Sequence, residues 1–192
     1  MINPKQITNF NRTEAELQEF LLFCIVVAGK NSHQQAIKLD NFLKGIGEYP
    51  LMENASPFNK ITFASQHQTL LTRLKQAKLG QYDRIYKAFI EVAARFNSLK
   101  SVTVDKLETV HGIGPKTARF FVMHSRPNQR VATLDTHILR WMRDIGIEAP
   151  KATPSGKSYL ELEEIFLDLC DYLGKTPAAL DLEIWKESAK AS

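Results

Sequence analysis

The sequence has few cysteines and no long apolar run, and both absences exclude classes of protein. Its 192 residues contain only two cysteines, Cys24 and Cys170, each among apolar neighbours. Two thiols cannot supply four-cysteine ligation of zinc or of an iron–sulfur cluster, and they do not make a disulfide framework. The longest apolar run, residues 20–28, is less than half as long as a membrane span. We therefore expect no metal site, no iron–sulfur cluster and no membrane anchor.

The N-terminal residues lack the basic-then-apolar layout of a signal peptide, so we expect a cytoplasmic protein, associated with the nucleoid if it is prokaryotic. With 44% hydrophobic and 24% charged residues, the composition is that of a folded globular protein and excludes general disorder.

Charge is unevenly distributed along the chain. Residues 111–143 carry six cations against one anion, whereas residues 150–192 carry five lysines against eight carboxylates. A concentrated basic stretch is expected where a protein neutralises phosphates. The same charges are also typical of a solvated helix face, so charge alone leaves both interpretations open.

Helical signals recur along the whole chain, and no segment has a convincing strand pattern. A Thr-x-x-Glu capping box at Thr13 begins a helix that ends at Gly29. Residues 48–60 contain two prolines and small polar residues, so we expect a loop there. From the apolar spacing and the caps, further helices are predicted at about residues 31–43 (capped by Asn31 or Ser32), 65–77, 82–96, 104–110, 116–124, 135–145 and 158–173, and from 177 onward. The fold class is all-α.

The segment His-Gly-Ile-Gly-Pro-Lys-Thr-Ala at residues 111–118 predicts a hairpin between two helices. Gly112 and Gly114 allow backbone conformations that side chains forbid and permit close approach to another surface, while Ile113 is expected to point inward. The free amides of the hairpin and of the helix that starts at Pro115 form a cradle for a DNA phosphate. Many helix–helix turns contain Gly-x-Gly, so this motif alone is weak evidence.

A second motif makes the interpretation specific. The segment Val-Ala-Thr-Leu-Asp-Thr-His at residues 131–137 places Asp135 nineteen residues after Lys116. Together the two motifs resemble the helix-hairpin-helix element and the Val-Asp-Thr-His pattern of the endonuclease III-like DNA glycosylase superfamily. The resemblance implies two helical subdomains, residues 29–130 and residues 1–28 plus 131–192, with DNA in the cleft between them.

The resemblance also implies the chemistry. Glycosylases with a lysine at the position of Lys116 attack the sugar C1′ and form a Schiff base that can also cleave the strand. The amine must be neutral to attack, and the positive end of a helix disfavours the ammonium. Asp135 is the expected partner; it is also an excellent N-cap, and the two roles are compatible. For His137 we expect a structural hydrogen bond rather than catalysis.

The C-terminal region, residues 158–185, resembles the compact type-2 8-oxoguanine DNA glycosylases, which lack an iron–sulfur cluster. On that resemblance Trp185 stacks on the flipped base and Asp181 accepts a hydrogen bond from it, although Trp185 could instead fill the core. Lys30 and Asn31 are the candidates to fill the gap left by the base, and Asn31 could be only a helix cap. The expected activity is excision of 8-oxoguanine with lyase activity at the abasic site.

Three arginines near the hairpin are candidates for phosphate contacts, and each could equally be a solvated surface residue: Arg119, Arg126 and Arg130. The expected partner is damaged double-stranded DNA bound by a monomer. We expect no cofactor, and we leave open whether a monovalent cation binds the hairpin carbonyls. Two alternatives stay open: a glycosylase/lyase for oxidised pyrimidines or abasic sites, and a non-catalytic helix-hairpin-helix module. The second does not need Lys116 and Asp135.

Overall fold

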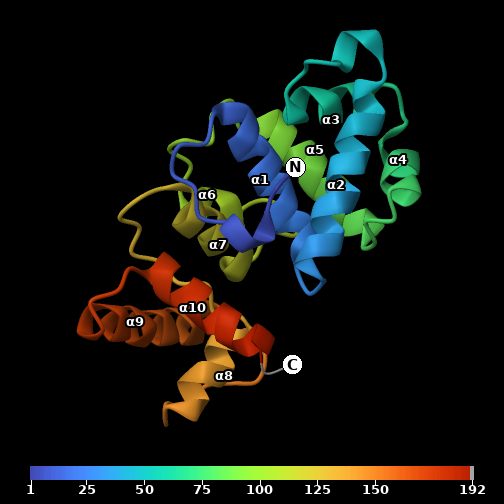
Figure 1. The fold of residues 1–192 in the computed structure, drawn as a ribbon. Helices are drawn as coiled ribbons and strands as arrows, with labels where there is room; N and C mark the ends of the chain where they lie inside the picture. The colour runs from blue at the N-terminus through green and yellow to red at the C-terminus, as the bar shows by residue number, and fades with distance from the viewer. Residues whose placement is uncertain (191–192) are drawn as a thin grey trace. The chain divides into compact units, whose positions relative to one another are not determined.

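The computed structural model describes residues 1–190, and every regular element in this range is a helix, as the sequence predicts. The chain separates into two compact units, one comprising Met1–Ile113 and the other beginning at Gly114 (Figure 1). The boundary therefore falls inside the predicted hairpin. Within residues 1–190, no helix combines the length and the apolar character that crossing a bilayer requires.

The first unit is built around its N-terminal helix. Its elements are η1 (Pro4–Gln6), α1 (Glu14–Val27), α2 (Ser32–Gly47), η2 (Pro50–Met52), α3 (Pro57–Gln66), α4 (Leu70–Gln76), α5 (Tyr82–Arg95) and α6 (Val104–Glu108). The capping box predicted at Thr13 is present at the start of α1. The second half of helix α1 is apolar on all sides, with every residue from Phe20 to Val26 buried, and the helix packs on α2, α3 and α5.

This packing differs from the division expected from the sequence, which grouped residues 1–28 with residues 131–192. Because α1 buries its side chains against α2, α3 and α5, residues 1–28 belong to the first unit. An evenly apolar helix carries no directional signal in its sequence, so the sequence did not indicate which helices would cover it. The expected DNA cleft stays a prediction.

The segment predicted as a loop at residues 48–60 is partly helical. Ser56 accepts a hydrogen bond from the Asn59 amide and Pro57 occupies the first helical position, so α3 begins inside the predicted loop. The single helix predicted at residues 65–77 is also wrong. It is divided between the end of α3 and α4, and Gln68 between them has a φ of 55°.

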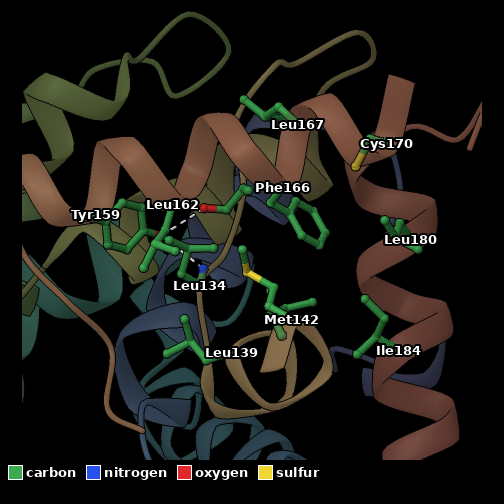
Figure 2. Close-up of a cluster of buried hydrophobic side chains, with 12 residues drawn as sticks. Leu134, Leu139, Met142, Tyr159, Leu162, Phe166, Leu167, Cys170, Leu180 and Ile184 are labelled. Carbon is green, nitrogen blue, oxygen red and sulfur yellow. Dashed lines mark hydrogen bonds between the residues drawn. The ribbon is translucent and has the colours of Figure 1, made fainter. Parts of the chain in front are cut away.

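The second unit contains α7 (Pro115–Ser125), α8 (Thr136–Asp144), α9 (Gly156–Tyr172) and α10 (Pro177–Lys190). Helix α10 packs on the other three. Apolar side chains from α8, α9 and α10 form its buried core, and Figure 2 labels most of them. The segment before α8 contributes Ala132 and Leu134 to this core. Because Ala132 and Leu134 pack in this core, the segment that leads into α8 is held against α9 and α10.

Candidate active site

Lys116 is the second residue of α7 and is partly buried. Gly114 is the N-cap of this helix and provides no side-chain hydrogen bond, while Pro115 occupies the first helical position. The amides of the first turn therefore have no side-chain cap. A helix start of this kind attracts anions.

The hairpin before α7 needs one of its two glycines for backbone geometry. Gly112 has a φ of +78°, a conformation that favours glycine. Gly114 has an extended backbone, a conformation that any residue type can adopt. No atom lies within 4 Å of the position a Cβ would take at Gly114, so the space beside it is open. Ile113 is buried, as predicted.

Asp135 is the N-cap of α8, as predicted. Its Oδ1 accepts hydrogen bonds from the amides of His137 at 2.8 Å and Ile138 at 3.0 Å. These bonds fix the carboxylate at the positive end of the helix. The His137 ring contacts the next turn of the same helix, with Nδ1 at 3.4 Å from Arg140 Nη2.

The segment that leads to Asp135 is held in place by two side chains of α9. The Tyr159 hydroxyl donates to the Ala132 carbonyl at 2.8 Å and accepts from the Leu134 amide at 3.1 Å, as drawn in Figure 2. Glu163 Oε1 accepts from the Ala132 amide at 2.7 Å. The backbone immediately before Asp135 therefore pairs with α9.

The same Glu163 also binds α7. Arg119 Nε lies 2.8 Å and 2.9 Å from the two Glu163 carboxylate oxygens, and the guanidinium stacks 4.6 Å from the centre of the Tyr159 ring. Arg119 is only 7% exposed. This burial and the pairing with Glu163 argue against the expectation that Arg119 neutralises a DNA phosphate. Arg119 lies on α7, three residues after Lys116. Through Glu163 it connects this helix to the segment before Asp135.

We expect Glu163→Gln to lower the free energy of unfolding by about 3 kcal/mol or more, because it leaves the Arg119 charge buried without its counterion. Urea denaturation measures the change. The control is Arg130→Gln, which removes exposed ion pairs and is expected to cost less than about 1 kcal/mol. The double variant Arg119→Met/Glu163→Leu should regain much of the loss. A Glu163→Gln variant as stable as the wild type would contradict this assignment.

The other two arginines predicted to contact phosphates differ from each other. Arg130 lies among carboxylates of α9, with Nη1 at 2.6 Å from Asp171 and Nη2 at 3.3 Å from Glu164 and 3.4 Å from Asp168. These acidic neighbours balance its charge, which argues against a phosphate contact. Arg126 is partly buried, and this burial lowers the pKa of its guanidinium.

The two candidates for filling the gap in DNA both have structural contacts. Lys30 Nζ donates to the Leu79 carbonyl at 2.7 Å. Asn31 is the N-cap of α2 and accepts from the Gln34 amide at 3.0 Å, which confirms the capping role considered for it. Asn31 remains exposed, whereas the Lys30 ammonium is directed at the protein's own backbone.

Asp181, predicted to bind the flipped base, is buried and pairs with a histidine that the sequence analysis did not single out. His124 on α7 is fully buried, and its Nε2 lies 3.2 Å from Asp181 Oδ2. Burial raises the pKa of Asp181, which His124 opposes; Asp135 raises this pKa further and Lys116 lowers it. Lys116 and Asp135 therefore each lie within electrostatic range of Asp181. The only sequence signal for His124 was a lone polar residue among buried apolar neighbours.

Trp185 lies one turn after Asp181 on α10 and is partly buried. Its neighbour Ile184 belongs to the core cluster of the second unit, whereas Trp185 is not among the residues of that cluster.

The expectation that no cofactor is needed stays a prediction, and two observations on metal ligands bear on it. Within residues 1–190, no group of three or more His, Cys, Asp or Glu side chains is placed to hold a metal ion. At the hairpin, the Gly112 carbonyl accepts a hydrogen bond from Arg84 Nη1 at 2.9 Å. A monovalent cation is therefore a poor fit at that carbonyl.

Comparisons with known proteins agree with these motifs. Residues 3–175 match the family model described as 8-oxoguanine DNA glycosylase. A protein of Thermoplasma volcanium named 8-oxoguanine DNA glycosylase/AP lyase is 38% identical over 197 residues, covering 96% of this chain and 87% of the relative. A protein of the same name from Fusobacterium nucleatum is 26% identical over 186 residues, covering 93% and 82%.

Solved structures agree as well. The 8-oxoguanine DNA glycosylase of Thermotoga maritima matches with a TM-score of 0.68 at 25% identity, over 94% of this chain and 84% of that one. The 8-oxoguanine glycosylase/lyase of Methanocaldococcus jannaschii, in complex with a 15mer DNA containing 8-oxoguanine, matches with a TM-score of 0.65 at 25% identity, over 94% and 86%. The chain belongs to the 8-oxoguanine DNA glycosylase family.

Proposed function

We propose that this protein removes 8-oxoguanine from double-stranded DNA and then cleaves the strand at the resulting abasic site. The observation that carries the proposal is that the second unit contains both Lys116 and Asp135, each at the start of a helix and each within electrostatic range of the buried Asp181. A DNA-binding module would need neither side chain. The names of the relatives support 8-oxoguanine as the lesion.

In the proposed first step, the neutral amine of Lys116 attacks C1′ of the flipped nucleotide. The bond between C1′ and N9 of the base breaks, its electron pair goes to the base, and the base leaves with a proton. Positive charge builds on the deoxyribose as this bond breaks. Asp135, fixed by two amides, stabilises that charge without having to reorganise.

In the proposed second step, the Lys116 nitrogen carries the lyase reaction. The sugar ring opens as the nitrogen forms a double bond to C1′, which gives a protonated Schiff base. Loss of a proton from C2′ then breaks the C3′–O bond by β-elimination, and the 3′ phosphate leaves. Water hydrolyses the Schiff base and returns the free amine.

Binding is proposed to use the hairpin amides for a phosphate and Trp185 for stacking on the flipped base, because stacking offsets the cost of extruding a base. Asp181 is a weaker candidate for reading the base, since its Oδ2 is engaged by His124. Both reacting side chains come from one chain, which supports action as a monomer. A DNA substrate also supports a cytoplasmic location, with association to the nucleoid if the protein is prokaryotic.

The decisive experiment is borohydride trapping with a panel of duplexes that each carry one lesion. We expect a covalent protein–DNA adduct and strand cleavage with 8-oxoguanine, and none with the undamaged duplex. Adducts only with oxidised pyrimidines or abasic sites would assign the chain to those lesions instead. Binding without any adduct would identify a non-catalytic module.

A further inference from the structure

Arg84 of α5 binds two other segments of the first unit, the end of α1 and the hairpin, and also the N-cap of its own helix. Its Nη1 donates to the Gly112 carbonyl at 2.9 Å, and its Nη2 donates to the Ile25 carbonyl near the end of α1 at 2.8 Å. Its Nε and Nη2 also donate to Gln81 Oε1, at 3.1 Å and 2.6 Å. A planar guanidinium with several donors can join three acceptors in this way, whereas an ammonium on a flexible stem is poorly suited to it.

The contact between Arg84 and the hairpin is close as well as hydrogen-bonded. A Cβ on Gly112 would lie 2.6 Å from Arg84 Cγ and 3.2 Å from its Cδ, so the arginine stem packs directly on the glycine backbone. Gly112 also has a φ of +78°. The glycine is therefore required both by its conformation and by the arginine that covers it.

Other residues of α5 bind the backbone just before this point. Glu91 Oε2 accepts from the His111 amide at 3.1 Å, and Arg95 donates to the carbonyl and hydroxyl oxygens of Thr109 at 3.2 Å and 2.7 Å. Of these three α5 residues, only Arg84 bonds to a glycine of the hairpin itself.

A second loop lies close to Arg84. Lys30, in the turn between α1 and α2, donates to the Leu79 carbonyl, two residues before Gln81. Burial lowers the pKa of Lys30, and the nearby charge of Arg84 lowers it further. The turn before α2, the turn before α5 and the hairpin are thus connected by two partly buried cationic side chains, Lys30 and Arg84.

We propose that Arg84 is a positioning residue for DNA binding, which holds the Gly112 backbone in the conformation that presents the hairpin amides to a phosphate. It acts through the hairpin and not by touching DNA, because its Nε and both terminal nitrogens are engaged by protein acceptors. This inference about Arg84 depends on the proposed function in one respect: both take DNA as the ligand.

The test measures dissociation constants for an undamaged duplex and for an 8-oxoguanine duplex of the same length. We expect Arg84→Ala to weaken both about tenfold, since phosphate contacts are independent of sequence. The single-turnover rate of base excision at saturating enzyme should stay within about twofold of the wild type. The matched control is Arg95→Ala, on the same helix and bonded to the same segment, which should change neither value more than about twofold.

A double-mutant cycle separates positioning from direct contact. Gly112→Ala keeps the arginine charge but displaces its stem, so it should reproduce the affinity loss of Arg84→Ala. The double variant should then lose no more than either single variant. Additive losses would indicate that Arg84 contacts DNA itself and would overturn the proposal.

Two further outcomes are informative. If Arg84→Ala does not fold, Arg84→Lys serves instead, with an affinity loss at unchanged melting temperature as the expected result. Unchanged affinity in folded Arg84 variants would overturn the proposal. Failure of the wild type to excise 8-oxoguanine would contradict the proposed function alone, because the undamaged-duplex measurements would still test Arg84.

Discussion

Replacing Lys116 with glutamine is expected to abolish borohydride trapping and to slow strand cleavage at 8-oxoguanine by about 10³-fold or more. The glutamine amide has nearly the length of lysine but no nucleophilic electron pair, so the covalent intermediate cannot form. The measurement is single-turnover cleavage of an 8-oxoguanine duplex, with adducts resolved by denaturing gel electrophoresis.

The same variant should bind the duplex nearly as well as the wild type, because the hairpin backbone is unchanged. Lys106→Gln is a suitable control, since Lys106 is an exposed lysine of α6 and its loss should leave trapping intact. An adduct that persists in Lys116→Gln at wild-type yield would assign the nucleophile to another amine.

The sequence predicted those features whose signals are local. The capping box at Thr13 and the N-caps at Asn31 and Asp135 each depend on residues within four positions of one another, and all three are present. Short-range hydrogen bonds of this kind determine where a helix begins whatever surrounds it. The start of α3 has the same type of signal, a serine followed by proline at Ser56, but two prolines nearby made the whole segment resemble a loop.

The sequence did not predict partners that are far apart in the chain. Arg119 and Glu163 are 44 residues apart, His124 and Asp181 are 57 apart, and Arg84 and Gly112 are 28 apart. A count of charges treats Arg119 as a surface cation, whereas in the structure it is buried against Glu163 and Tyr159 of α9. The motif therefore pointed to the side chains proposed to react, while the residues that hold them depended on tertiary packing.

The Asp135 variants separate two roles that one carboxylate combines. Asparagine caps a helix about as well as aspartate, so Asp135→Asn should change the free energy of unfolding by no more than about 0.5 kcal/mol, whereas Asp135→Ala should lose about 1 kcal/mol. Base excision should nevertheless fall by about 10²–10³-fold in Asp135→Asn, because no fixed negative charge faces the developing positive charge on the sugar. Single-turnover excision kinetics and urea denaturation measure the two effects.

Abasic DNA distinguishes whether the Asp135 carboxylate assists cleavage of the glycosidic bond or deprotonation of Lys116. A preformed abasic site has no glycosidic bond to break, so a carboxylate that stabilises charge at that bond is dispensable there, and Asp135→Asn should retain most of its Schiff-base trapping on abasic duplex. If Asp135 instead acts mainly by taking the proton from Lys116, trapping on abasic duplex and excision of 8-oxoguanine should fall together, because both need the neutral amine. Full excision activity in Asp135→Asn would restrict the carboxylate to capping α8, since the cap is the only role that asparagine preserves.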